Sequence, residues 1–420
     1  MSTIDLLQTV MERIEALGKI SEEPDRLTRT YGSAAMKKAN ELVASWMKEA
    51  GMTVSEDAIG NLIGHYPGNG DYPKTFLLGS HLDTVRDAGK FDGALGVLAG
   101  IACIQQLHQS NTRLPFAIDV LGFADEEGAR FQTMYLGSRA VAGSFKEEDL
   151  KRFDARGVSL ADAIRSFGGD PEKLATARRD PQSLLGYTEL HIEQGPVLDK
   201  KHQPAGVVTA IAGQSRVKVR FTGQAGHAGT TPMGMRRDAL VAAAHFIVAV
   251  EGCTREHPGL VATVGQIEAR PGASNVIPGD VVLSLDVRHQ LDAARTAACA
   301  RLQEVALGTG EKRGVVVDWE TVQETQSVPC SRELTTVLAK AARRHLVDVT
   351  ELASGAGHDA AIIGDITPMA MLFVRCRGGV SHHPDESVLA DDVRVAIAVL
   401  SDFLLLLANQ WGPLSGAKQG

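Results

Sequence analysis

The sequence predicts an α/β fold, in which a mixed sheet is flanked by helices and a smaller α+β domain is inserted into the chain. The 420 residues exceed what one compact core of usual size holds, so two domains are expected. Strand-like, helical and strand-like patterns follow one another across residues 75–128, which is the order that gives parallel strands. From about residue 212, apolar and polar residues alternate, as they do in half-exposed antiparallel strands.

The larger domain is predicted from the spacing of apolar residues near both ends of the chain. In the predicted helices apolar residues recur every three or four positions, and the strand-like apolar runs end in polar residues. Such polar endings of parallel strands collect at one edge of a sheet, where active residues lie. The expected elements are helices at 1–20, 36–50, 93–110, 332–345 and 393–411, strands at 75–83, 114–128, 189–193 and 367–374, and a polar tail at 412–420.

The inserted domain is predicted from six consecutive patterns. Their order is strand, helix, strand, strand, helix, strand, which resembles the ferredoxin-like split βαβ arrangement. The six segments are 215–223, 237–253, 260–271, 280–290, 291–308 and 314–322. We therefore expect a main domain at 1–211 and 328–420, and an inserted domain at 212–327.

Composition restricts the classes of function. The net charge of −8 disfavours a nucleic-acid partner, because no excess of Lys and Arg is available to neutralise phosphates. The N-terminal stretch carries acids and lacks a long apolar core, so no signal peptide is expected. Arg394 and Asp402 interrupt the most apolar C-terminal window, which indicates a buried helix and no membrane partner. The five scattered cysteines, among which Cys376 is the one candidate reactive thiol, indicate reduced thiols in a cytoplasmic protein.

Candidate chemical groups follow the predicted strands. His81 and Asp83 have the spacing that places two side chains on one face of a strand end, so the carboxylate can orient the imidazole. Asp92 precedes a helix, and Glu126 and Glu127 follow the next strand. Each has an ordinary structural interpretation, as a helix cap or as an acid that complements a helix dipole.

Further histidines follow later in the chain. His191 and Glu193 lie in a strand-like stretch, and His382 and His383 lie in a loop bounded by Gly and Pro. Taken singly, each histidine is better explained as a surface or core residue. Together with the carboxylates, they form a ligand set that suits Zn, Mn, Co or Ni, and one bridging carboxylate is typical of a two-metal hydrolytic site.

Seven ordered motifs between about residues 30 and 410 resemble one family. They are GSHLDTVRDAGKFDGALGV, ADEEGARF, ELHIEQGPVLD, GQAGHAGTTPMGMRRDA, ASNVIPGDVVLSLDVRH, SGAGHDA and GVSHHPDE. Together they resemble the hydantoinase/carbamoylase branch of the dinuclear-zinc peptidase-like superfamily. The resemblance implies a zinc-peptidase-like catalytic domain, an inserted ferredoxin-like lid and dimerisation domain, and two divalent metal ions per subunit.

The resemblance also implies roles for individual residues. Glu126 corresponds to the general base and Asp83 to the residue that orients a ligand histidine. Asp92 corresponds to the carboxylate that bridges both metals, and His383 falls on a variable position. The implied metal ligands are His81, Asp92, Glu127, His191 and His382. One departure is Ala88, where many relatives have a second glycine.

The inserted domain is expected to bind the substrate. The resemblance makes His227 an oxyanion-stabilising donor that reaches the active site of a partner subunit, although a structural histidine capping a turn is the alternative. It also implies a homodimer formed through this domain, and closure about hinges near residues 212 and 328. The other expected contacts are Gln194, Gln214, Arg216, Asn275, Arg288, Gly357 and His358, the last of which equally fits a buried packing residue.

The predicted function is hydrolysis of the ureido carbon–nitrogen bond of a small carboxylate by metal-activated water. Allantoate and an N-carbamoyl-L-amino acid are the leading substrates, with a slight preference for allantoate. Loss of ammonia would leave a carbamate, which breaks down to CO2 and an amine. Two alternatives are an aminopeptidase or deacylase of the same superfamily and a metal-dependent binding protein without activity.

Overall fold

The computed structural model describes residues 3–70 and 72–410, so the predicted tail at 412–420 lies outside the described residues. The described chain divides into two compact units. The first comprises the chain up to Thr209, Cys330–Leu352 and the chain from Gly357 onward. The second comprises Ala210–Pro329 and the short segment Ala353–Ala356, which the sequence analysis placed in the main domain.

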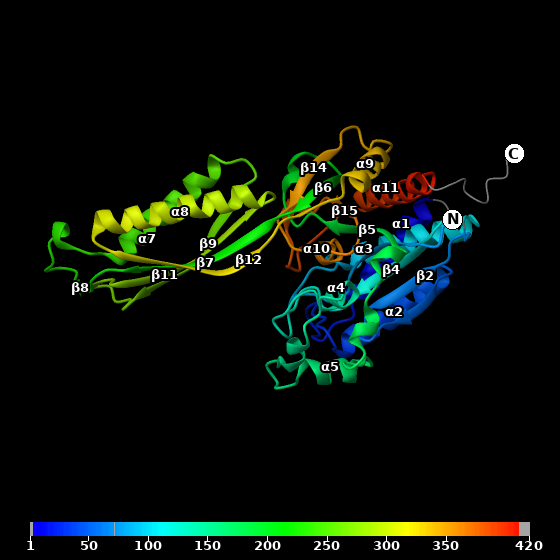
Figure 1. Ribbon diagram of the computed structural model, residues 1–420, viewed down its shortest axis with the longest axis horizontal. Helices are drawn as coiled ribbons and strands as arrows, with labels where there is room; N and C mark the ends of the chain where they lie inside the picture. The colour runs from blue at the N-terminus through cyan, green and yellow to red at the C-terminus, as the bar shows by residue number, and fades with distance from the viewer. Residues whose placement is uncertain (1–2, 71, 411–420) are drawn as a thin grey trace. The chain divides into compact units, whose positions relative to one another are not determined.

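A mixed nine-stranded sheet forms the centre of the first unit (Figure 1). The strand order is β1-β2-β4-β3-β5-β15-β6-β13, and β14 pairs with β6. The central strands β4, β3, β5 and β15 are parallel, whereas β1, β2 and β6 pair antiparallel to their neighbours. The strands are β1 (Thr53–Glu56), β2 (Leu62–Tyr66), β3 (Thr75–His81), β4 (Ala117–Phe123), β5 (Leu184–Ile192), β6 (Ala205–Ile211), β13 (Val328–Pro329), β14 (Thr350–Ser354) and β15 (Met369–Val374).

The apolar strands of the sheet centre are buried on both faces. Every residue of β15 (Met369–Val374) is buried, as are all residues of β3 after Thr75. Such continuous apolar runs are expected of parallel strands that helices cover on both faces. The helices are α1 (Thr3–Gly18), α2 (Ala34–Glu49), α3 (Ala94–Gln109), α4 (Leu136–Ala142), α5 (Leu160–Phe167), α6 (Val197–Lys200), α9 (Arg332–Ala342), α10 (Asp359–Ile363) and α11 (Ala390–Ala408).

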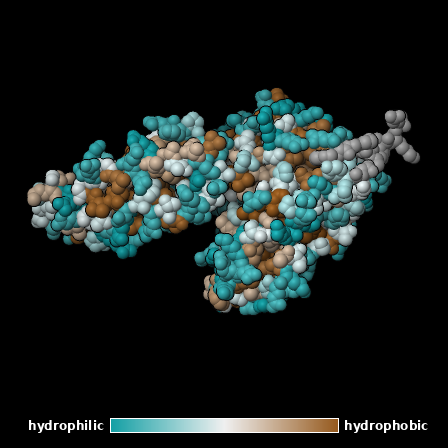
Figure 2. All heavy atoms as spheres, viewed as in Figure 1, coloured by the Kyte–Doolittle hydropathy of each residue, from teal (hydrophilic) through white to brown (hydrophobic). Residues whose placement is uncertain are grey.

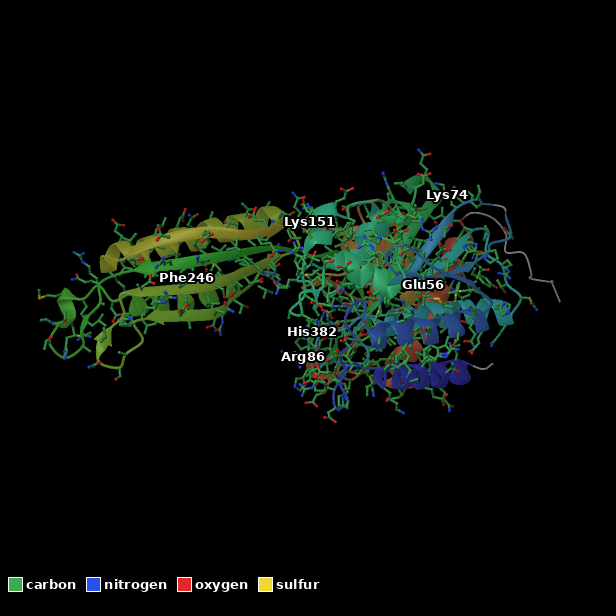
Figure 3. All side chains as sticks on the ribbon, turned by 90° about the horizontal axis from the view of Figure 1, so that it is seen from below. Glu56, Lys74, Arg86, Lys151, Phe246 and His382 are labelled. Atoms are coloured by element: carbon green, nitrogen blue, oxygen red, sulfur yellow. The ribbon has the colours of Figure 1, made fainter. Side chains whose placement is uncertain are left out.

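The second unit is a four-stranded antiparallel sheet with order β12-β7-β11-β9 and two long helices. The order of its elements along the chain is strand, helix, strand, strand, helix, strand, so the ferredoxin-like arrangement is confirmed. Alternate residues of the strands face the helices and pack around the buried Phe246 (Figure 3). The elements are β7 (Gly213–Thr222), β8 (Gly226–His227), α7 (Ala239–Arg255), β9 (Val261–Arg270), β10 (Val276–Ile277), β11 (Asp280–His289), α8 (Asp292–Arg313) and β12 (Val316–Thr325).

The predicted fold class is therefore confirmed: a mixed α/β sheet with helices, and a separate antiparallel sheet. The five cysteines are free thiols. Cys376 is buried, and burial raises the pKa of its thiol to about 12, which removes it as a reactive nucleophile. No helix in the described ranges has both the length and the apolar character that crossing a membrane requires.

Candidate metal centre and recognition residues

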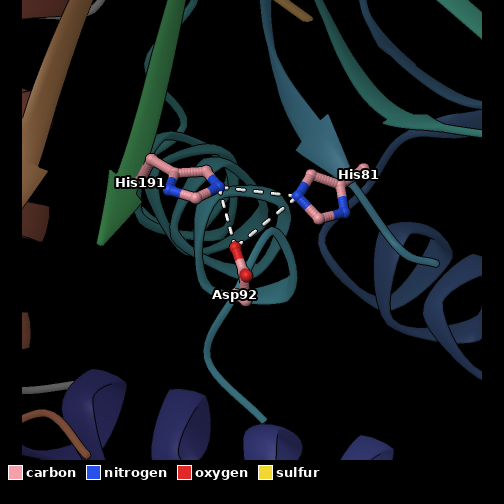
Figure 4. Close-up of side chains that lie close together, drawn as sticks. All are labelled: His81, Asp92 and His191. Carbon is pink, nitrogen blue, oxygen red and sulfur yellow. Dashed lines mark hydrogen bonds and ion pairs between the residues drawn. The ribbon is translucent and has the colours of Figure 1, made fainter. Parts of the chain in front are cut away.

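Three candidate ligands meet at the carboxyl edge of the first unit's sheet. His81 ends β3, His191 lies near the end of the neighbouring parallel strand β5, and Asp92 precedes α3. Asp92 Oδ1 lies 3.1 Å from His191 Nε2 and 3.7 Å from His81 Nε2, and the two Nε2 atoms are 3.5 Å apart (Figure 4). All three side chains are buried.

The Nδ1 atoms of His81 and His191 form hydrogen bonds that fix the orientation and the tautomer of each ring. His81 Nδ1 lies 3.1 Å from the carbonyl oxygen of Asp83, and His191 Nδ1 lies 2.9 Å from the carbonyl oxygen of Ile192. A carbonyl can only accept, so Nδ1 carries the proton in each neutral ring and Nε2 offers a lone pair. Asp92 Oδ1, between the two Nε2 atoms, is buried and has no hydrogen-bond partner among the described residues. This donor set fits a divalent cation.

A second group of three shares Asp92 with the first. Asp92 Oδ2 lies 3.2 Å from His382 Nε2, which is 3.6 Å from Glu127 Oε1. The ligand atoms of Asp92, Glu127 and His382 lie within 4.8 Å of one another. Each oxygen of Asp92 thus faces a different triad, as a bridging carboxylate requires. His383 instead accepts a hydrogen bond from the backbone N–H of Asp385.

The adjacent glutamates are held by one carboxylate. The backbone N–H groups of Glu126 and Glu127 donate to the two oxygens of Asp83, over 3.0 and 3.1 Å. The carboxylate of Asp83 is 3.6 Å from His81 Nδ1, farther than its own backbone carbonyl. Asp83 therefore positions the loop that carries the glutamates as well as lying beside the histidine.

The site has more carboxylates than cations. Burial raises the pKa of Glu126 well above its usual value, and burial together with Asp92 raises the pKa of Glu127 to about 7. Burial also opposes ionisation of Asp92, but the neighbouring imidazoles of His191 and His382 outweigh it and hold the pKa of Asp92 well below its usual range. The hydrogen bond with Asp92 raises the pKa of His382 to about 9. A negative site of this kind favours cations.

Two polar residues tie the ligand loops together. Glu386 accepts hydrogen bonds from the backbone N–H groups of Phe91 and Asp92 and from the hydroxyl of Ser381. A side-chain carbon on Gly89 would collide with this carboxylate at 2.3 Å, so the loop needs glycine there. Gln194 Nε2 lies 3.1 Å from Asp92 Oδ2 and 3.2 Å from His382 Nε2, which places this expected substrate contact on the candidate ligands themselves.

The other residues of the first unit that the sequence analysis named have various surroundings. His358 is buried, with its ring edge-on to His191 at 4.5 Å, and it groups with Glu189 and His191 as a further set of possible ligands. Gly357 is exposed, and a side chain there would meet the hydroxyl of Tyr135 at 1.9 Å. Glu193 caps α6 by accepting from the backbone N–H groups of Val197 and Leu198. The backbone of Ala88 lies outside the positive-φ region that favours glycine, so its methyl group is accommodated.

Three expected substrate contacts gather at one end of the second unit's sheet. Gln214 and Arg216 lie at the start of β7, directly opposite Arg288 and Asp286 near the end of β11. Asp286 accepts hydrogen bonds from all three of the expected residues. No sequence motif had marked Asp286 as a site residue.

The remaining two expected contacts lie at the opposite end of the same unit (Figure 1). His227 pairs with Val276 in a short ladder that continues from Asn275 and precedes β11. His227 Nδ1 accepts from the backbone N–H of Gly229, so its Nε2 carries the proton and can donate. His227 and Asn275 are both exposed. The histidine is thus presented as a hydrogen-bond donor.

A sheet edge that gathers two His/carboxylate triads around one aspartate defines a class of metal-dependent hydrolases. A family model described as Peptidase family M20/M25/M40 matches residues 77–406. A probable allantoate deiminase of Oryza sativa subsp. japonica is 40% identical, over 94% of this chain and 87% of its own. An N-carbamoyl-L-amino acid amidohydrolase of Geobacillus stearothermophilus is 41% identical, over 96% of this chain and 98% of its own. The crystal structure of a hydantoinase/carbamoylase family amidase from Burkholderia ambifaria aligns with a TM-score of 0.90 at 32% identity, over 97% of this chain and 98% of its own.

The chain therefore belongs to peptidase family M20/M25/M40, and within it to the hydantoinase/carbamoylase amidases. The resemblance drawn from the seven motifs is confirmed. The protein is a hydrolase of the carbamoylase and allantoate amidohydrolase type, which acts on carbon–nitrogen bonds other than peptide bonds. The buried cluster of His, Asp and Glu indicates metal binding.

Proposed function

We propose that this protein uses two divalent metal ions to hydrolyse the terminal ureido bond of a small carboxylate, with Glu126 as the general base. The observation that carries the proposal is Asp92, which presents one oxygen to His81 and His191 and the other to Glu127 and His382. Glu126 belongs to neither triad but lies within 4.8 Å of His81 and Glu127. A carboxylate in that place is free to take a proton from water.

A ureido carbon is a poor electrophile because resonance with nitrogen stabilises it. Bound metal ions would lower the pKa of water from about 15.7 to about 7 and polarise the ureido oxygen. Glu126 would accept the proton of the water and then donate it to the departing nitrogen. Its burial keeps bulk water from competing for that proton. Release of ammonia leaves a carbamate, which decomposes to CO2 and an amine.

Arg288 is the proposed partner of the substrate carboxylate, because a guanidinium binds a carboxylate through two parallel hydrogen bonds. His227 is the proposed donor to the developing oxyanion, and Asn275 offers both a donor and an acceptor to the ureido group. Gln194, Gln214 and Arg216 are further proposed polar contacts, as is the backbone of Gly357.

A second copy of the chain is proposed to supply His227 and Asn275. His227 and Asn275 precede β11, whereas Arg288 lies near the far end of this strand. The first residue of β11, Asp280, is already separated from Arg288 by roughly 26 Å along the extended strand. A small ureido acid cannot span that distance. One chain therefore cannot bring both groups to one substrate molecule, which supports a homodimer in which each copy completes the site of the other.

The inserted unit also carries an apolar surface suited to such an association. Val241 and Val248 lie seven residues apart on α7, and thus on one face, and are 39% and 71% exposed. Figure 2 shows apolar surface between polar side chains in the region of α7 and α8. Contiguous exposed apolar surface is found where proteins associate.

The proposed substrates are allantoate and N-carbamoyl-L-amino acids, and a panel assay separates them. Purified protein is stripped of metal with a chelator, reloaded with Mn, Co, Ni or Zn, and offered allantoate, ureidoglycolate, N-carbamoyl-L-amino acids and N-carbamoyl-β-alanine. We expect ammonia release from at least one ureido acid, abolished by the chelator and restored by metal. Release from none of them, with N-acyl amino acids cleaved instead, would contradict the proposal.

A further inference from the structure

Asp286 connects three of the expected recognition residues of the second unit, Gln214, Arg216 and Arg288. Its side chain lies on the sheet face opposite the helices, 27% exposed, directly across from Arg216 on β7. Asp286 Oδ2 lies 2.5 Å from Gln214 Nε2, 3.4 Å from Arg216 Nε and 3.1 Å from Arg288 Nη2. Asp286 Oδ1 lies 2.8 Å from Arg288 Nε. One carboxylate thus holds one amide and two guanidinium groups.

The hydrogen bonds of Arg288 fix its guanidinium plane. Nε and Nη2 donate to Asp286, and Nη1 donates to the carbonyl oxygen of Gly355 over 2.7 Å. A guanidinium has about five N–H donors, so one remains on each terminal nitrogen. Arg288 is 33% exposed, and neither Asp286 nor Gly355 occupies these two donors. The guanidinium is therefore held in place while retaining a pair of donors for an incoming anion.

We propose that Asp286 is a positioning residue, which holds Arg288 in the orientation that receives the substrate carboxylate and gathers Gln214 and Arg216 beside it. This inference rests on the proposed function, since it requires a carboxylate substrate bound by Arg288. Fixing the guanidinium in advance removes the loss of side-chain freedom that binding would otherwise cost. Asp286 itself does not touch the substrate, because its oxygens face the three side chains.

The chain offers a matched control on the same strand and the same face. Asp280 receives Arg220 in the same two-bond geometry, over 2.7 and 3.1 Å, at the other end of β11. Arg220 has no proposed role in recognition. Loss of Asp280 removes one Arg–Asp pair from the open sheet face, and loss of Asp286 removes two. In neither variant would a purely structural effect change the preference for an acid over an uncharged substrate.

The experiment compares Asp286→Asn with Asp280→Asn on a cleaved ureido acid and on its uncharged carboxamide. For Asp286→Asn we expect KM for the acid to rise about tenfold with little change in kcat. The lost interaction stabilises the bound substrate and the transition state equally, so only binding is weakened. KM for the carboxamide should stay near the wild-type value, so the preference for the acid falls. Asp280→Asn should keep the wild-type preference.

Two results would overturn the inference. One is equal behaviour of the Asp286→Asn and Asp280→Asn proteins, and the other is an equal loss of kcat on acid and carboxamide. If Asp286→Asn does not fold, Asp286→Glu retains the charge but displaces it by one methylene group, and should shift the acid preference in the same direction by a smaller factor. Wild-type protein that cleaves no ureido acid would contradict the proposed function instead, so the two failures are distinguishable.

Discussion

The adjacent residues Glu126 and Glu127 are both acidic but have different surroundings. Glu127 belongs to a triad with Asp92 and His382, whereas Glu126 groups with His81 and Glu127. Asp83 fixes the backbone of both through their N–H groups. Two acids that look redundant in sequence are therefore held by one anchor and directed toward different partners.

Exchanging each glutamate for glutamine should separate these roles. In Glu126→Gln we expect bound metal to remain near the wild-type amount and turnover to fall by about 10²-fold or more, because the proton acceptor is lost. In Glu127→Gln we expect about one metal ion fewer per chain, because a neutral amide is a weaker ligand than a carboxylate. Elemental analysis of the purified proteins, together with an ammonia-release assay, measures both quantities. Equal loss of metal from the two variants would contradict the different roles.

The candidate site residues that could be predicted lie in short, recognisable sequence motifs. His81, Asp92, Glu126, Glu127, His191 and His382 follow strand ends, and motif spacing marks them. Glu386 and Asp286 could not be found in this way, because their partners are set by tertiary structure: Glu386 meets Asp92 across 294 positions, and Asp286 meets Gln214 across 72. Such pairings cannot be predicted from a sequence pattern unless the neighbouring strands are already known.

At the scale of elements, the long patterns predicted long elements well. The strands at β3, β4 and β15 and both helices of the inserted unit lie within a few residues of the predicted ranges. The strands β1, β2, β6 and β14 received no prediction. They are four to seven residues long, and their alternation is too brief to separate from loop sequence.

One cross-strand pair at this scale has a pH-dependent effect on stability. His65 on β2 lies opposite Asp119 on β4, and the two side chains are 2.7 Å apart. The hydrogen bond to Asp119 raises the pKa of His65 in the folded protein. Folding thus favours protonated His65, so the stabilisation is complete below the unfolded pKa of about 6.5 and is lost as the pH rises through the folded pKa.

We therefore expect His65→Gln to lower Tm more at pH 5.5 than at pH 8.5. Thermal unfolding followed by circular dichroism at both pH values measures the difference. The same substitution made in an Asp119→Asn background should have lost this pH dependence, since the charged partner is gone. A Tm difference independent of pH in the wild-type background would show that the pair contributes nothing through protonation.

At the scale of the whole molecule, the separation of Arg288 from His227 along the inserted unit predicts complementation between subunits. Glu126→Gln and His227→Ala should each be nearly inactive as homodimers. In a hybrid dimer, the subunit with intact Glu126 receives His227 from its partner, so one site of the two is complete. Random hybrids of equal amounts should regain about a quarter of wild-type activity.

Co-expression with two affinity tags isolates the hybrid for the ammonia-release assay. The control places both substitutions in one chain and pairs it with a wild-type copy, which leaves neither site complete. An active control together with an inactive first hybrid would show that each chain uses its own histidine.

The position of β15 and Glu386 late in the chain has a consequence for biosynthesis. β15 joins the sheet between β5 and β6, and Glu386 then fixes the backbone of Asp92. A chain still emerging from the ribosome already contains His81, Asp92, Glu127 and His191, but it lacks His382 and the carboxylate that holds the bridging aspartate in place. Acquisition of metal is therefore expected to be among the last events in the maturation of this protein, after synthesis has nearly ended and the sheet has closed.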